Sequence, residues 1–197
     1  SEEEYKSTVG CIEHIKSDKV ILMMKETPHD FFLTHPDNSY IRKMNRPTIV
    51  EFDSGNEYSG QGVVANTWPE YTMKRWGSYI NCPNVTGYVA RTDRYGDTSI
   101  VGTANEIQLY ALKRMTEEQT VSPMQIYNEF ITSRYGEDAL LPIRKAFQNA
   151  YDIVTSVFYT LGTNLTDHSS LNYENNKWGY SRHVSGRWID PPMVLVK

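Results

Sequence analysis

Three short apolar segments, each followed by polar residues, constrain the fold more than any other feature of the chain. Val20–Met24 is a continuous apolar run, whereas residues 48–52 and 85–89 are rich in β-branched residues and closely follow Pro47 and Pro83. Such runs indicate strands that are buried in a sheet. The intervening segments are long enough for the crossovers that parallel strands require. We therefore expect an α/β fold in which strands at 20–24, 48–52 and 85–89 lie parallel and side by side.

Helical patterns dominate the rest of the chain. One lies between the second and third strands, and the others follow residue 99; they cover Trp68–Trp76, Asn105–Met115, Met124–Tyr135 and Pro142–Leu161. Ser122 and Gly136 are typical residues for the start and end of the third of these helices. The expected organisation is βα units over residues 1–104, a helical region over 105–162 and an irregular tail over 163–197.

Composition places the chain among soluble globular proteins. Of its 197 residues 39% are hydrophobic and 12% aromatic, and the net charge is −4. The mild acidity and the lack of a Lys/Arg cluster argue against nucleic acids and anionic membranes as partners. The longest apolar run is far shorter than the roughly 20 residues that span a bilayer. We expect a soluble protein that is either cytoplasmic or periplasmic/secreted.

Cysteine and histidine give no sign of a metal site. Cys11 and Cys82 lie far apart in the sequence, and the five His residues show no paired ligand spacing. Paired spacings are typical of zinc sites and several other metal sites. We expect neither a metal nor another cofactor.

The first candidate site residues, Lys25 and Asp30, follow the first strand directly. Catalytic groups of α/β proteins gather at the carboxyl ends of strands, where loops vary without disturbing the core. A carboxylate there can act as a general base, and a lysine can bind an anionic group. The alternative is structural: Asp30 caps a short helix and Lys25 is solvated.

The second strand also ends in acidic residues, and glycines lie among them. Asp53 and Glu57 belong to this loop, which also carries Gly60 and Gly62. Glycine lets a backbone approach a ligand closely. Glu57 and Asp30, at neighbouring strand ends, are expected to converge on one water molecule in a shared cleft with Lys25. The alternative is a surface loop with solvated acids.

Further candidate binding residues are Arg91, Asp93 and Trp68. Arg91 and Asp93 follow the third strand, and a guanidinium group suits recognition of a carboxylate or of sugar hydroxyls. Mutual salt bridges are the competing role. Trp68 offers a stacking face for a sugar, although most aromatic side chains belong to the core.

The order of these motifs resembles glycoside hydrolase family 67, the α-glucuronidases. Residues 25–31, Lys-Glu-Thr-Pro-His-Asp-Phe, resemble the family's Lys-Asn-Gly-Pro-Ile-Asp-Phe, and residues 51–61 resemble its Glu-Phe-Gln-Ile-Thr-Gln-Glu-Tyr-x-Gly-Gln. Asn105, Tyr110-Ala111 and Arg114 resemble its following helix. The similarity covers roughly residues 19–160. It departs from the family pattern at Glu106, where the family has Trp, at Thr34-His-Pro36, where it has Arg-Glu-Pro, and after Gln61.

The resemblance implies the C-terminal part of a (β/α)8 TIM barrel, with about three strands, followed by a mostly helical region. It implies that Lys25 binds a uronate carboxylate and that Asp30 and Glu57 are the candidate bases of an inverting hydrolysis. The expected substrates are oligosaccharides from plant or algal polysaccharides, and a related glycosidase family is the alternative within this class.

A complete barrel needs about 250 residues and eight strands, so we expect this chain to be part of a longer enzyme whose general acid lies upstream. Without that acid, the chain alone is expected not to hydrolyse glycosides. Two assemblies fit this interpretation: a homodimer through the helical region, or association with the missing barrel portion. From a different class, the alternative is a non-catalytic carbohydrate-binding or scaffold domain.

Overall fold

The computed structural model describes residues 2–60, 64–93 and 99–159 of the chain. Its central element is a sheet of three parallel strands, β1 (Leu22–Lys25), β2 (Thr48–Phe52) and β3 (Val85–Ala90), in the order β1-β2-β3. Lys25 lies opposite Glu51, and Phe52 lies opposite Ala90. The predicted parallel arrangement is therefore confirmed.

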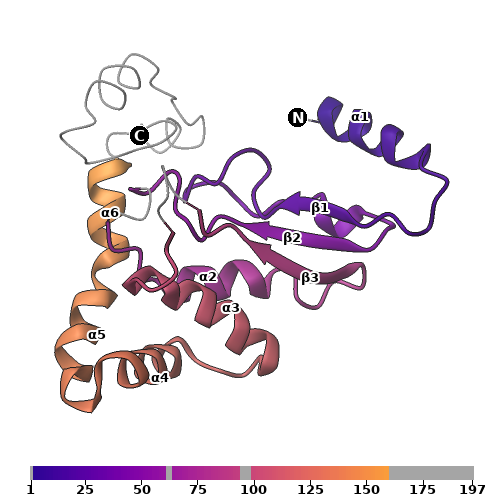
Figure 1. Cartoon of the computed structure of the whole chain (residues 1–197). Coiled ribbons are helices and arrows are strands. Elements are labelled where there is room, and N and C mark those ends of the chain that lie inside the picture. Colours follow the sequence, from indigo (N-terminus) through magenta and orange to yellow (C-terminus); the bar gives the residue numbers. More distant parts are fainter. Residues whose placement is uncertain (1, 61–63, 94–98, 160–197) are drawn as a thin grey trace.

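One face of the sheet packs against helices α2 (Pro69–Gly77) and α3 (Ile107–Glu117), as Figure 1 shows. Val50 and Phe52 point to this side and contact Trp76 of α2 and Leu112 of α3. The indole Nε1 of Trp76 also donates a hydrogen bond to Thr116 Oγ1 at 2.9 Å, which joins the two helices. Helix α3 therefore belongs to the same core as the sheet and α2.

Among the described residues, the opposite face of the sheet has little cover. Met23 of β1 is 63% exposed and Val89 of β3 is 39% exposed, and Ile21, just before β1, is 54% exposed. Parallel sheets normally have both faces covered, since their strands are apolar on both sides. In the described residues this sheet therefore has one covered face and one largely exposed apolar face.

The remaining helical elements lie before, between and after the strands in the chain. A short 3₁₀ helix, η2 (Ala104–Glu106), leads into α3, and α4 (Pro123–Tyr135) packs on α3. Ser122 caps α4 through a reciprocal pair of hydrogen bonds with Gln125, and the helix ends at Gly136 as predicted. The other described helical elements are α1 (Glu2–Glu13), η1 (Ile41–Lys43), η3 (Glu137–Ala139), α5 (Leu140–Gln148) and α6 (Ala150–Phe158).

The single helix predicted over Pro142–Leu161 is wrong: α5 and α6 are separate helices. Asn149 lies between them, and its side-chain Nδ2 donates a hydrogen bond to the carbonyl of Lys145 at 2.9 Å. An asparagine that bonds to nearby backbone in this way competes with the helical hydrogen-bond ladder. Helix α1 was not predicted, and the expected tail over 163–197 lies outside the described residues.

Candidate active site at the carboxyl edge of the sheet

Lys25 and Asp30 form an ion pair at the carboxyl end of β1. Lys25 Nζ contacts Asp30 Oδ1, and the two side chains are 39% and 44% exposed. The Lys25 ammonium group also lies 4.9 Å from the centroid of the Phe31 ring. The loop is tightly turned, because the Thr27 hydroxyl donates to the backbone carbonyl of Asp30 at 3.0 Å. Asp30 is therefore held at the sheet edge by its own loop and by the last residue of the strand.

Asp30 is ionised at neutral pH. Burial alone would raise its pKa, but hydrogen bonds from Lys25 and Tyr58 and the positive charge of Lys25 together hold the pKa below its usual value. Opposite charges and hydrogen bonds to the charged form both favour that form. The carboxylate can accept a proton but is a weak base while Lys25 is bound to it.

Glu57 and Arg91 form the second ion pair at this edge. Arg91 follows β3 directly, and its Nη1 lies 2.9 Å from Glu57 Oε2, while its Nε lies 3.3 Å from Asp93 Oδ1. The backbone amide of Glu57 donates to Asp53 Oδ2 at 2.6 Å. Burial would lower the pKa of Arg91, but Asp93, Asp53 and Glu57 together raise it above the ordinary arginine value. The guanidinium group thus links the loops after β2 and β3.

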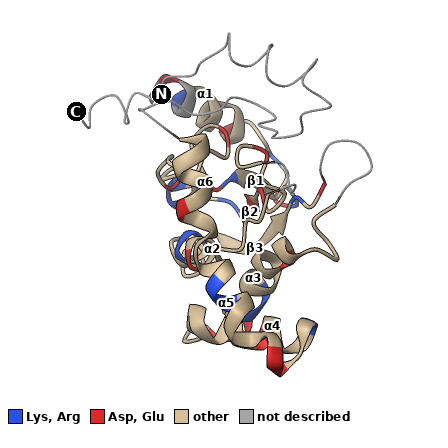
Figure 2. Ribbon diagram, turned by 90° about the vertical axis from the view of Figure 1, so that its left-hand side faces the viewer, with Lys and Arg blue, Asp and Glu red and all other residues tan. Residues whose placement is uncertain are grey.

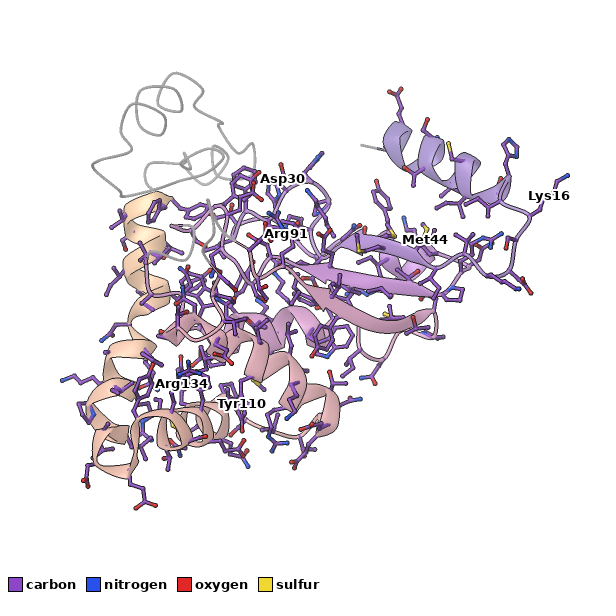
Figure 3. All side chains as sticks on the ribbon, viewed as in Figure 1. Lys16, Asp30, Met44, Arg91, Tyr110 and Arg134 are labelled. Atoms are coloured by element: carbon purple, nitrogen blue, oxygen red, sulfur yellow. The ribbon has the colours of Figure 1, made fainter. Side chains whose placement is uncertain are left out.

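Tyr58, the neighbour of Glu57 in the chain, joins the loop after β2 to Asp30. Its side chain is 2% exposed, its ring centroid lies 4.1 Å from that of Phe32, and its hydroxyl hydrogen-bonds to Asp30. The hydroxyl of Tyr159 donates to the Tyr58 carbonyl at 2.9 Å and accepts from the Leu33 amide at 3.2 Å. The loops after β1 and β2 are therefore joined, and Figure 3 shows Asp30 and Arg91 at the same end of the strands.

The other predicted residues lie in different environments. Trp68 is 2% exposed and packs edge-on against Tyr151, so its ring belongs to the core. Asp93 is exposed and contacts Arg91. His29 is exposed. The backbone at Gly60 does approach other atoms closely, but these atoms belong to the protein and not to a ligand. A Cβ atom at Gly60 would lie 2.6 Å from Val64 Cγ2. Gly62 lies outside the described residues.

A small polar cavity lies behind the edge, between the sheet and the helices. Its volume is about 20 Å³, and it is lined by Glu26, Asp53, Asn56, Arg75 and Gln108 together with Trp68 and several other residues. A cavity of this size holds about one water molecule. Asp30 and Glu57 do not line it, so the shared cleft expected for them and Lys25 is not this cavity.

Glu26 is a buried acid that sequence reasoning missed. The residue is 5% exposed, and its Oε2 lies 3.4 Å from Arg75 Nε in α2. Burial raises its pKa to about 7; Arg75 opposes this rise, whereas Asp37 and Asp53 add to it. The two-residue period of a strand could have found it, because Met24 and Glu26 share a face and Lys25 lies on the other.

The described residues contain no group of three or more His, Cys, Asp or Glu side chains that could hold a metal ion. None of the described helices has the length and apolar character needed to cross a membrane. In Figure 2, basic and acidic residues are mixed along the described helices.

Comparison with models of protein families and with curated proteins finds no match for this chain.

Proposed function

We propose that this chain is part of a glycoside hydrolase that acts on uronate-containing oligosaccharides. The observation that carries the proposal is the presence of two cation–carboxylate pairs, Lys25–Asp30 and Arg91–Glu57, at the carboxyl edge of a parallel sheet. Active sites of parallel α/β proteins lie at this edge. The resemblance to family 67 concerns three of these four residues, Lys25, Asp30 and Glu57.

In this proposal the cations bind the acidic sugar and one carboxylate activates water. A uronate carboxylate that binds Lys25 competes with Asp30 for the ammonium group. Loss of that contact raises the pKa of Asp30, which makes it a better base. Glu57 is the alternative base, and the Arg91 fork can hold a second carboxylate beside it.

The exposed face of the sheet supports a larger barrel. The helices cover one face, as in a (β/α)8 barrel, and the opposite face carries apolar side chains such as Met23 and Val89. In such a barrel this face packs against side chains from other strands. Further βα units would also supply the general acid, which must stand roughly 6.5–9.5 Å from the base in an inverting enzyme.

A carbohydrate-binding domain without catalysis is the second candidate. It is favoured by the pairing of both carboxylates with cations, because paired acids are poor bases but good anchors for hydroxyl groups. Either function is compatible with a second copy of the chain docking through the helical region.

The test is hydrolysis of aldouronic oligosaccharides and aryl glycosides by the chain alone and by the longer protein that the proposal requires. We expect turnover by the longer protein only, reduced about 10²–10⁴-fold by Glu57→Gln or Asp30→Asn, whichever removes the base. Asp18→Asn, a change of an exposed acid outside the site, is the matched control.

Binding of the same oligosaccharides by the chain separates the two candidates. Calorimetric binding that Lys25→Met weakens, without turnover by the longer protein, would favour the binding domain. Absence of both binding and turnover on all glycosides would exclude both candidates.

A further inference from the structure

Arg75 is a buried arginine of helix α2 that binds the loop after β1. Its Nη1 lies 3.0 Å from Asp37 Oδ1, and its Nη2 donates to the backbone carbonyls of Leu33, at 3.3 Å, and of His35. The same nitrogen donates to the Tyr71 hydroxyl at 2.9 Å. The side chain is only 7% exposed. Arg75 therefore fixes the backbone of residues 33–37 to a helix.

The segment held by Arg75 in turn contacts Asp30. The Nδ1 of His35 lies 3.0 Å from the Asp30 carbonyl oxygen, and the amide of Phe32 donates to the same oxygen at 2.8 Å. The amide of His35 donates to the carbonyl of Phe32 at 3.0 Å. A displacement of residues 33–37 is thus transmitted to the backbone of Asp30 through two short steps.

Glu26 is the buried acid beside the Arg75 guanidinium group. Among the described residues its Oε2 accepts no hydrogen bond, although it lies 3.4 Å from Arg75 Nε. The charged and titratable groups around Glu26 are Arg75 and Tyr71 from α2, Tyr79 just after α2, Asp37 from the loop after β1, and Asp53 from the loop after β2. The guanidinium group is therefore surrounded by Glu26, Asp37 and loop carbonyls, and it is the common partner of all of them.

We propose that Arg75 is a positioning residue for Asp30: from helix α2 it holds the 33–37 loop, and through that loop it keeps the Asp30 carboxylate on Lys25 and Tyr58. The fork of an arginine is needed for this, because one guanidinium donates to several acceptors in fixed directions. A role of Arg75 in catalysis rests on the proposed function. Its effect on the position of Asp30 does not depend on that function.

The test measures the pKa of Asp30 by NMR titration of its carboxyl carbon in the chain. In Arg75→Gln the carboxylate moves from Lys25 and Tyr58, so its pKa rises toward that of an ordinary aspartate. Amide exchange at residues 33–38 becomes faster, on the order of tenfold or more, because several hydrogen bonds are lost. Arg114→Gln is the matched control: Arg114 joins α3 to α4 through Glu129, and its loss leaves the Asp30 pKa unchanged.

A second variant guards against misfolding. Glu26→Gln combined with Arg75→Gln removes both buried charges, so no lone carboxylate is left in the core, and the Asp30 pKa rises as in the single variant. An Asp30 pKa that stays at the wild-type value in a folded Arg75 variant overturns the inference.

Kinetics keep this inference separate from the proposed function. In an active longer protein, Arg75→Gln lowers kcat by about 10²-fold, because a base displaced by about 1 Å loses more from its wrong position than it gains from its raised pKa. The change in KM is smaller. A raised Asp30 pKa without any glycosidase activity would support the positioning role and contradict the proposed function.

Discussion

Lys25 and Glu26 are neighbours in the chain, yet their side chains lie on opposite sides of the sheet. Lys25 is partly exposed and binds Asp30, whereas Glu26 is buried against Arg75. Successive residues of an extended chain alternate between faces, so one step along the chain separates a candidate binding residue from a core ion pair. Two charged residues of similar appearance in the sequence therefore have different roles.

The first prediction at this scale concerns Glu26 and pH. Its pKa of about 7 lies above the ordinary value of 4.5, so between these pH values the folded protein keeps a proton that the unfolded chain releases. The free energy of unfolding therefore falls as the pH rises from about 4.5 to about 7, by on the order of 3 kcal/mol, and then levels off. Urea unfolding at several pH values should show this fall in the wild type and not in Glu26→Gln.

The exposed Glu13→Gln serves as the control for the loss of one acid, and it should keep the wild-type pH profile. Asp30 does not change the free energy of unfolding in this pH range, because its pKa is lowered from the ordinary value of 3.8. Its contribution to stability is lost only at lower pH, as the carboxylate becomes protonated. Parallel profiles for the wild type and Glu26→Gln would contradict the prediction.

At the scale of elements, helix ends are encoded locally, but helix breaks are decided by context. Ser122 and Gly136 bound α4 in the sequence and in the structure. Asn149 lies in an apolar periodic pattern that continues on both sides. In the structure its side-chain amide donates to the Lys145 carbonyl, while its backbone amide donates to the Ala146 carbonyl at 3.3 Å. Val154 and Phe158 of α6 pack against Leu33 and Trp68, close to the candidate site.

The capping of α4 gives a prediction at the same scale. Ser122→Ala removes the side-chain oxygen that accepts from the Gln125 amide, so the free energy of unfolding should fall by about 1 kcal/mol. Ser122→Thr should restore most of it. Urea denaturation measures the change, and Ser156→Ala, at an exposed position within α6, should have little effect. Equal stability of the Ser122 and Ser156 variants would refute the capping role.

At the scale of the whole molecule, the parallel sheet has one covered face and one exposed apolar face (Figure 1). Met24 contacts the core around Trp76, whereas its neighbour Met23 is 63% exposed. If further βα units complete a barrel, Met23 becomes a core residue in the longer protein.

Met23→Ala tests this arrangement. In the chain alone it should change the free energy of unfolding by less than about 0.5 kcal/mol, as for other surface positions. In the longer protein it should lower it by about 2 kcal/mol or more, the cost of a core truncation. Met24→Ala, the control, should destabilise both proteins. A similarly small effect of Met23→Ala in both proteins would argue against a covered face.

The sequence by itself determined the strands, their parallel order and the caps of α4, because these depend on local composition and on short-range hydrogen bonds. It also brought Lys25, Asp30, Glu57 and Arg91 to one edge, since the carboxyl ends of adjacent parallel strands meet there. The tertiary structure decided how these charges are paired and which acid is buried. Arg75 meets Glu26 and the loop carbonyls only when α2 packs on the sheet. Such pairings depend on contacts between distant segments, and no local pattern of residue types encodes them.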